Sequence, residues 1–109
     1  MIQKNIAVIA FGFTAFGFAA LVASTGHASE KLFKDSGCTA CHAMEKKLVG
    51  PALKDIAAKY KGKKGADAIL ATKIKNGSKD VWGVIPMPPN AAVSDGDTLI
   101  LAKWVLTQQ

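Results

Sequence analysis

The chain has 109 residues, with 14 lysines, 8 acidic residues, no arginine and a formal net charge of +6. A chain of this length holds one domain at most. Nucleic-acid binding is not expected, because base and phosphate recognition favours the bidentate guanidinium, and no aromatic residues are interleaved with the lysines. A lysine-rich surface suits acidic protein partners, or simply keeps the protein soluble.

Residues 1–28 are predicted to be a secretory signal peptide. An apolar run without charge covers residues 6–23, and Gly26 and Ala28 supply the small residues that signal peptidase requires before a cut. Cleavage after Ala28 would leave residues 29–109 as the exported mature domain. Because the apolar run reaches the lower limit of a membrane span, a retained membrane anchor is the alternative.

The mature part is predicted to be all-α, with four short helices within residues 29–37, 53–62, 66–77 and 94–107. In the first of these segments Ser29 is a candidate N-cap and Gly37 a stop, and in the last Ser94 and Asp97 resemble a capping box. The two middle segments have apolar residues at helical spacing: Leu53, Ile56, Ala57 and Tyr60, then Ala66, Leu70 and Ile74. These faces are thin for a domain of 109 − 28 = 81 residues, so a disulfide, metal or cofactor is expected to complete the core.

The most informative stretch is CTACH at residues 38–42, which holds both cysteines and the only histidine of the mature chain. A disulfide would close a very short loop, a thioredoxin-like pair is expected beside a βαβ pattern that is missing, and a structural zinc site needs a fourth ligand. C-x-x-C-H is the signature of covalent haem c attachment. Cys38 and Cys41 would then form thioethers with the two vinyl groups, and His42 would be an axial ligand of the iron.

The sixth ligand of such an iron must come from the opposite face of the ring. Met44 is too close to His42 to reach that face, and His27 lies in the predicted signal peptide. Met87 lies 87 − 42 = 45 residues beyond His42, in the segment IPMPPN, where three prolines stiffen the loop. A methionine that fills a gap in a core needs no rigid frame, and a lysine ligand must first lose its proton. The sequence therefore favours His42 and Met87 as the axial pair.

With these residues, the chain resembles a small bacterial class I cytochrome c of the c-551/c-552 type. The resemblance covers nearly all of residues 29–109 and rests on GCTACHAMEKKLVGPAL, VWGVIPMPPN and SDGDTLILAKWVL. It implies a fold of about four short helices around one covalent haem, in which the first and last helices cross. Phe33 and Trp104 would pack near that crossing. The doubled alanine in NAAVSD leaves the length of the following loop open.

The resemblance also implies roles for three residues around the axial ligands. The carbonyl of Pro51 would accept the proton on the His42 ring nitrogen that faces away from iron, which fixes the orientation and basicity of the ring. Trp82 would reach a haem propionate, and Asn90 would lie near the ligating sulfur. The structural alternatives are a helix start for Pro51, a core residue for Trp82 and a turn residue for Asn90.

An iron with both axial positions filled has no vacancy for O₂, peroxide or substrate, so its redox chemistry reduces to one-electron transfer. We therefore expect a monomeric periplasmic electron carrier and not an enzyme, without stable membrane association after signal cleavage. Its partners would be a quinol-side donor and a terminal reductase or oxidase with acidic docking surfaces, toward which the lysines steer it. The rival hypotheses are a haem enzyme or ligand-binding haem protein with an open distal site, and a subunit fixed in a larger complex.

Overall fold

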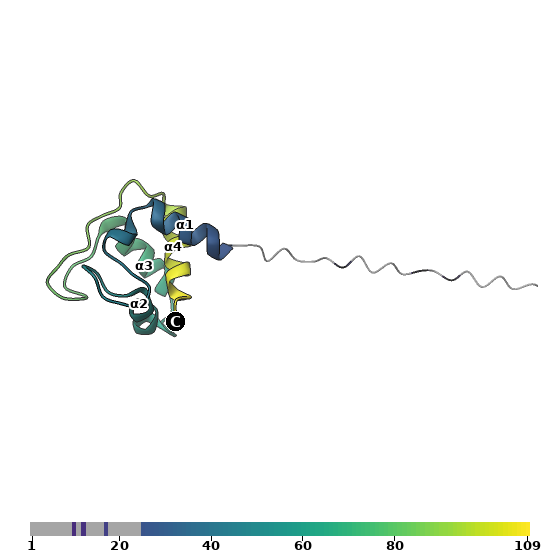
Figure 1. The fold of residues 1–109 in the computed structure, drawn as a ribbon, viewed down its shortest axis with the longest axis horizontal. Coiled ribbons are helices and arrows are strands. Elements are labelled where there is room, and N and C mark those ends of the chain that lie inside the picture. Colours follow the sequence, from purple (N-terminus) through teal and green to yellow (C-terminus); the bar gives the residue numbers. More distant parts are fainter. Residues whose placement is uncertain (1–9, 11, 13–16, 18–24) are drawn as a thin grey trace, which may run out of the picture.

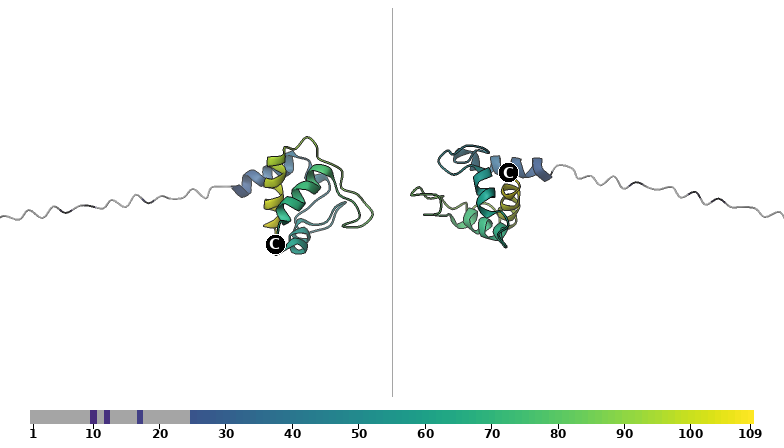
Figure 2. Two further views of the ribbon diagram at one scale, coloured as in Figure 1. Left: turned by 180° about the vertical axis from the view of Figure 1, so that it is seen from behind. Right: turned by 90° about the horizontal axis from the view of Figure 1, so that it is seen from below.

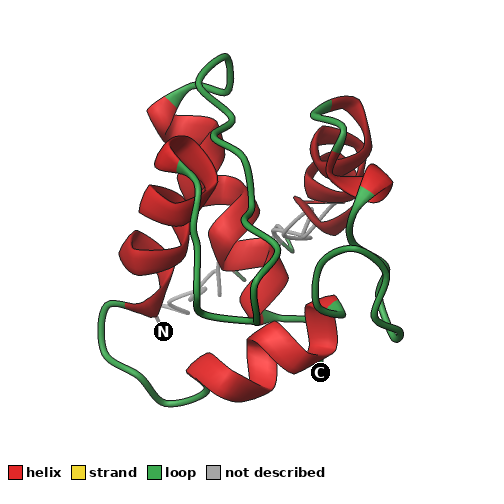
Figure 3. Cartoon of the chain, turned by 90° about the vertical axis from the view of Figure 1, so that its left-hand side faces the viewer, coloured by secondary structure: helices red, strands yellow, loops and turns green. Residues whose placement is uncertain are grey.

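Figure 1 shows the computed structural model, which describes residues 10, 12, 17 and 25–109. The elements are α1 (Thr25–Asp35), a 3₁₀ turn η1 (Cys38–Ala40), α2 (Leu53–Tyr60), α3 (Ala66–Asn76) and α4 (Asp95–Leu106). Only helices and loops occur among the described residues, as Figure 3 shows by its colours. The predicted all-α architecture is confirmed.

The helix ends follow from the residues that flank them, with one exception. The side-chain oxygen of Ser94 accepts a hydrogen bond from the backbone N–H of Asp97 at 3.1 Å, which is the N-cap bond of the predicted capping box. Gly37 adopts a left-handed conformation with φ 78° directly before η1. The exception is α1, which begins at Thr25, so Ser29 is a buried residue inside the helix and not its N-cap. The N-cap prediction for Ser29 is wrong because the uncut chain continues the helical hydrogen bonds upstream of this residue.

The core is organised around α4, which contacts α1, α2 and α3. At the contact of α1 and α4 the rings of Phe33 and Trp104 have centroids 5.2 Å apart and planes at 49°, which confirms the predicted packing of this pair. The four apolar residues predicted for one face of α2 are all buried. On α3, Ala66 and Leu70 are buried, and Ile74 packs against the core from its edge.

Two long connections, residues 41–52 and 77–94, extend away from the helices on the same side of the molecule, which the two views of Figure 2 show together with Figure 1. They contain most of the residues predicted to bind a cofactor. Among the residues described, β-type pairing in them consists of two isolated bridges, His42 with Lys47 and Ser78 with Met87.

The predicted signal peptide falls mostly on residues outside the described part, which includes only residues 10, 12, 17 and 25–28 of it. Cleavage after Ala28 stays a prediction. Among the helices of the described part, none combines the length and the apolar character that crossing a bilayer requires.

Candidate cofactor site

A hollow of about 1030 Å³, counted with its open mouth, lies between the helices and the two long connections. Six of the seven predicted site residues line it: Cys38, Cys41, His42, Pro51, Trp82 and Met87. Much of the remaining wall is apolar and comes from all four α-helices: Phe33, Leu53, Ile56, Leu70, Ile74, Leu101, Ala102 and Val105. Apolar hollows with a few converging polar groups are typical of sites for organic ligands and cofactors.

One side of the hollow is built by the tight turn that contains both cysteines. His42 and Cys41 donate their backbone N–H groups to the carbonyl oxygen of Cys38, at 2.9 Å and 3.2 Å. These bonds hold two free thiols and an imidazole within one turn. Burial raises the pKa of the Cys38 thiol, and Cys41 acts in the same direction, while a backbone hydrogen bond lowers it.

The imidazole of His42 is fixed from behind by the segment that follows the turn. Its Nδ1 lies 2.8 Å from the carbonyl oxygen of Pro51, which is the contact that the resemblance implied. In the tautomer protonated at Nδ1 the ring donates this hydrogen bond, which leaves the lone pair of Nε2 available for a metal. The N–H of Gly50 donates to the carbonyl oxygen of Cys41 at 2.8 Å and brings this segment against the ring.

Gly50 is a site residue that the sequence reasoning missed. A Cβ atom at this position would lie 2.6 Å from Cε1 and 3.0 Å from Nδ1 of His42, so the ring occupies space that any other side chain would need. The signal that could have found it is a glycine directly before the proline of VGPAL.

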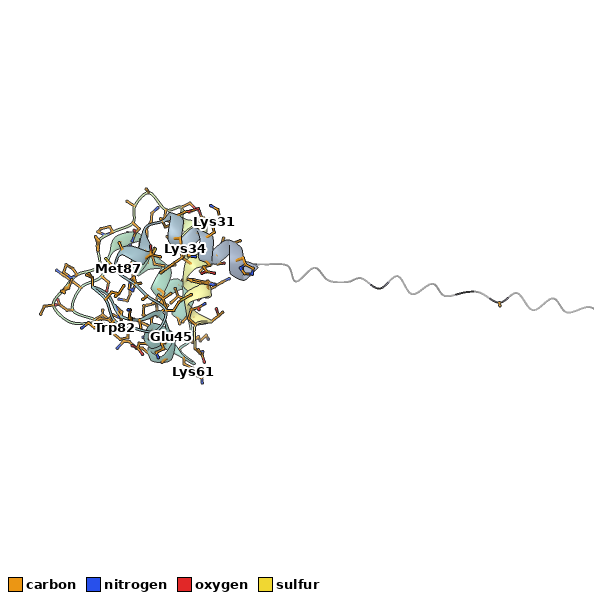
Figure 4. The ribbon with its side chains drawn as sticks, viewed as in Figure 1. Lys31, Lys34, Glu45, Lys61, Trp82 and Met87 are labelled. Atoms are coloured by element: carbon orange, nitrogen blue, oxygen red, sulfur yellow. The ribbon has the colours of Figure 1, made fainter. Side chains whose placement is uncertain are left out.

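The other side of the hollow is the loop that contains Met87. Met87 and Ser78 exchange two backbone hydrogen bonds: the N–H of Met87 donates at 2.7 Å and its carbonyl oxygen accepts at 3.0 Å. Gly77, also missed from the sequence, packs against the same residue, because a Cβ atom there would lie 2.7 Å from the carbonyl oxygen of Met87. Met87 is thus fastened to the residues that directly follow α3. Figure 4 shows Met87 and Trp82 on the side of the molecule away from the start of α1.

Asn90 and Trp82 differ in how they relate to the hollow. Asn90 lies outside its wall, and its side-chain amide donates to the carbonyl oxygens of Ile74 at 3.2 Å and Pro88 at 3.4 Å. Trp82 is on the wall and is partly exposed, and Nζ of Lys59 lies 5.2 Å from its ring centroid in a cation–π contact. Asn90 therefore ties the loop that contains Met87, called the methionine loop below, to α3. Trp82 lies at the edge of the hollow.

Comparison with known proteins identifies the family to which the chain belongs. The family model described as Cytochrome c matches residues 27–109. The chain belongs to the cytochrome c family. It is 64% identical over 80 residues to cytochrome c-551 of Pseudomonas aeruginosa, which is 73% of this chain and 76% of that protein. It is 58% identical over 89 residues to cytochrome c-552 of Nitrosomonas europaea, which is 82% of this chain and 86% of that protein.

The fold agrees with this assignment. The crystal structure of wild-type Nitrosomonas europaea cytochrome c552 superposes with a TM-score of 0.72 at 59% identity, over 73% of this chain and 99% of that one. The protein therefore has the class I cytochrome c fold, and its cofactor is one covalently bound haem c with its iron. The hollow fits this group, because it combines an apolar wall with two free thiols, an imidazole and a thioether.

Proposed function

We propose that this cytochrome c is a one-electron carrier in which Cys38 and Cys41 carry the thioether links and His42 and Met87 are the axial ligands. One observation supports it above all: His42 and Met87 lie on the wall of one hollow, and each belongs to a separately hydrogen-bonded segment. The bound haem supplies an iron that cycles between its ferrous and ferric states. The chain holds both ligands in place, which leaves no open position for a substrate.

The apolar wall and the fixed ligands make the proposed transfer efficient. Leu53 and Leu101, both almost fully buried, keep water from the interior of the hollow. Pro51 fixes the His42 ring, and Ser78 fixes the backbone of Met87. The ligand geometry can then stay the same in both oxidation states, which limits the rearrangement that accompanies transfer.

We propose that redox partners dock at the rim of the hollow. The two connections expose apolar side chains there, of which Val84 is 90% and Ile85 61% exposed; the others are Leu48, Val49 and Trp82. Val49, Trp82 and Ile85 also line the hollow, so the exposed group reaches its mouth. Lysines on the same connections, Lys46, Lys47 and Lys79, would steer the rim toward acidic partner surfaces, such as those of a quinol-side donor or a terminal reductase or oxidase. Reduction rates should then fall as salt is raised.

Export to the periplasm with cleavage after Ala28 belongs to the same proposal, and its test is the intact mass of the exported protein. The mass of residues 29–109 plus one haem supports it. Retention of residues 1–28 supports the membrane anchor instead. An exported protein that purifies as a free monomer would argue against a subunit fixed in a larger complex.

The ligand assignment is tested by the visible spectrum of the oxidised protein. A bond between sulfur and ferric iron gives a charge-transfer band in the far red, which the wild-type protein should show. Met87→Ala should lose this band and let added imidazole or cyanide bind readily. Met44→Ala is the matched control, because Met44 is exposed and is not on the wall of the hollow. A wild-type spectrum without the band, or a Met87→Ala variant that keeps it, would show that the assignment is wrong.

A further inference from the structure

Lys75 makes a set of contacts that the proposed electron transfer does not explain. It lies in the last turn of α3, and its side chain is only 31% exposed. Its Nζ donates to the backbone carbonyl oxygens of Ala91 at 3.1 Å and Val93 at 2.6 Å, and it lies 3.5 Å from Oδ1 of Asp95. One ammonium group thus joins α3 to three residues of a segment that lies 16 to 20 positions further along the chain.

The segment that Lys75 holds is the connection between the methionine loop and α4. It contains the doubled alanine, where the length of the loop could not be judged from the sequence. Among residues 91–94, Val93 donates its N–H to the carbonyl oxygen of Asn90 at 3.1 Å, which closes a turn. Asp95 is the first residue of α4. The Lys75 ammonium therefore fixes residues 91–93 relative to α3, and its exposed ion pair with Asp95 adds little.

The methionine loop needs such an external anchor. Pro88 and Pro89 have no N–H group, so the two residues that follow Met87 cannot donate a backbone hydrogen bond. The next donor is Asn90, whose N–H reaches the carbonyl oxygen of Ile74 at 3.0 Å and whose amide reaches the same atom. Residues 87–90 are thus held at one end by Ser78 and at the other by Asn90, directly before the part that Lys75 binds.

We propose that Lys75 is a positioning residue for Met87, which it holds toward the haem by clamping residues 91–95 and so the Asn90 anchor. The inference rests on the proposed axial role of Met87. The clamp works because hydrogen bonds from a charged donor are stronger than neutral ones, and the bond to the carbonyl oxygen of Val93 is partly buried while the bond to Ala91 is exposed. It acts on the loop from outside the hollow, since Lys75 is not on its wall.

The test is Lys75→Met, which keeps the apolar stem and removes the charge and all donors. Imidazole is added to the oxidised holoprotein, and the loss of the far-red band gives the concentration that displaces half of the methionine. We expect this concentration to fall roughly three- to tenfold. The variant loses the hydrogen bonds of a charged donor, but only part of their free energy is transmitted to Met87. In parallel, amide hydrogen exchange of Met87 and Asn90 should become faster.

Three further variants separate the clamp from other effects. Lys75→Arg keeps a charged donor and should recover most of the wild-type behaviour. Asp95→Asn should change the imidazole concentration less than about twofold, because the Asp95 side chain is 93% exposed and such ion pairs contribute little. Lys103→Met removes the same charge from an exposed position on α4 and should resemble the wild type. If Lys75→Met does not fold, Lys75→Gln is used in its place. It keeps one amide donor, so the imidazole concentration should fall by a smaller factor.

The inference is overturned if Lys75→Met behaves like Lys103→Met in imidazole displacement, or if its Met87 and Asn90 amides exchange at the wild-type rate. Failure of the proposed function looks different, since it shows in the wild-type protein as a missing far-red band. Amide exchange can be measured and compared between variants whether or not Met87 is bound to iron. Unchanged exchange in Lys75→Met would therefore overturn the inference in that case too.

Discussion

At the scale of single residues, the two proposed axial ligands are each packed against a glycine. Gly50 lies against the ring of His42, and Gly77 lies against the backbone of Met87. In both cases a Cβ atom would come closer than 3.0 Å to an atom of the ligand residue. The absence of a side chain at these two glycines is therefore part of the site. It lets the backbone around each glycine approach the ligand residue closely enough to form hydrogen bonds.

Gly50→Ala should displace the imidazole of His42. The methyl group would overlap Cε1 and push the ring away from the carbonyl of Pro51, so we expect the free energy of unfolding of the holoprotein to fall by about 1–3 kcal/mol, the usual cost of overpacking. Denaturant unfolding measures it. Gly96→Ala is the control: it lies in α4 with nothing within 4 Å, so it should be neutral or slightly stabilising. Equal stability of Gly50→Ala and wild type would contradict the packing argument.

Gly77→Ala combines a strained backbone with a blocked contact. Gly77 has φ 81° and ψ 175°, a region that is essentially restricted to glycine and costs other residues about 1–3 kcal/mol. The new Cβ atom would also meet the carbonyl of Met87, so imidazole should displace Met87 at a lower concentration than in wild type. Gly62→Ala, with φ 71° and nothing within 4 Å, carries backbone strain alone. If both variants respond alike to imidazole, the contact with Met87 is irrelevant.

At the scale of elements, local sequence patterns were sufficient to predict most helices. They were not sufficient to predict contacts between residues from different segments of the chain. The face of α2 and the cap of α4 depend on residues within one or two turns, so spacing and capping residues predict them. The packing of Gly50 on His42 joins residues that only the folded loop brings together, and no periodicity encodes it. The Lys75 contacts could not be predicted for the same reason, since a lysine at the end of a helix usually faces water. The CTACH turn was recognisable because its chemistry lies within five consecutive residues.

The start of α4 is the element boundary with the clearest local cause. Ser94→Ala removes the oxygen that accepts the N–H of Asp97, and we expect the free energy of unfolding to fall by about 1 kcal/mol. Because α4 contacts all three other α-helices, this loss should appear in global unfolding and not only as fraying of one end. Ser94→Asp retains an N-cap acceptor and should remain near the wild type. A loss of the same size in both variants would mean that the cap is not the cause.

At the scale of the whole molecule, the hydrophobic core and the wall of the cofactor site are largely the same residues. Phe33, Leu53, Leu101 and Val105 belong to both. A domain this small buries too little apolar surface to tolerate an open interior. The haem is therefore expected to be part of the core as well as the redox centre, and its attachment should be coupled to folding.

Preventing attachment tests this coupling directly. In the double variant Cys38→Ser/Cys41→Ser no thioether can form, and the apolar wall would face water when haem dissociates. We expect a loss on the order of 5 kcal/mol, comparable to the entire stability of a small domain. Far-UV circular dichroism should show reduced helix content, and urea unfolding should lose its cooperative transition. Either single variant keeps one attachment point and should be intermediate. A double variant with the helix content and urea midpoint of the holoprotein would show that the four α-helices form a sufficient core without haem, which their thin apolar faces argue against.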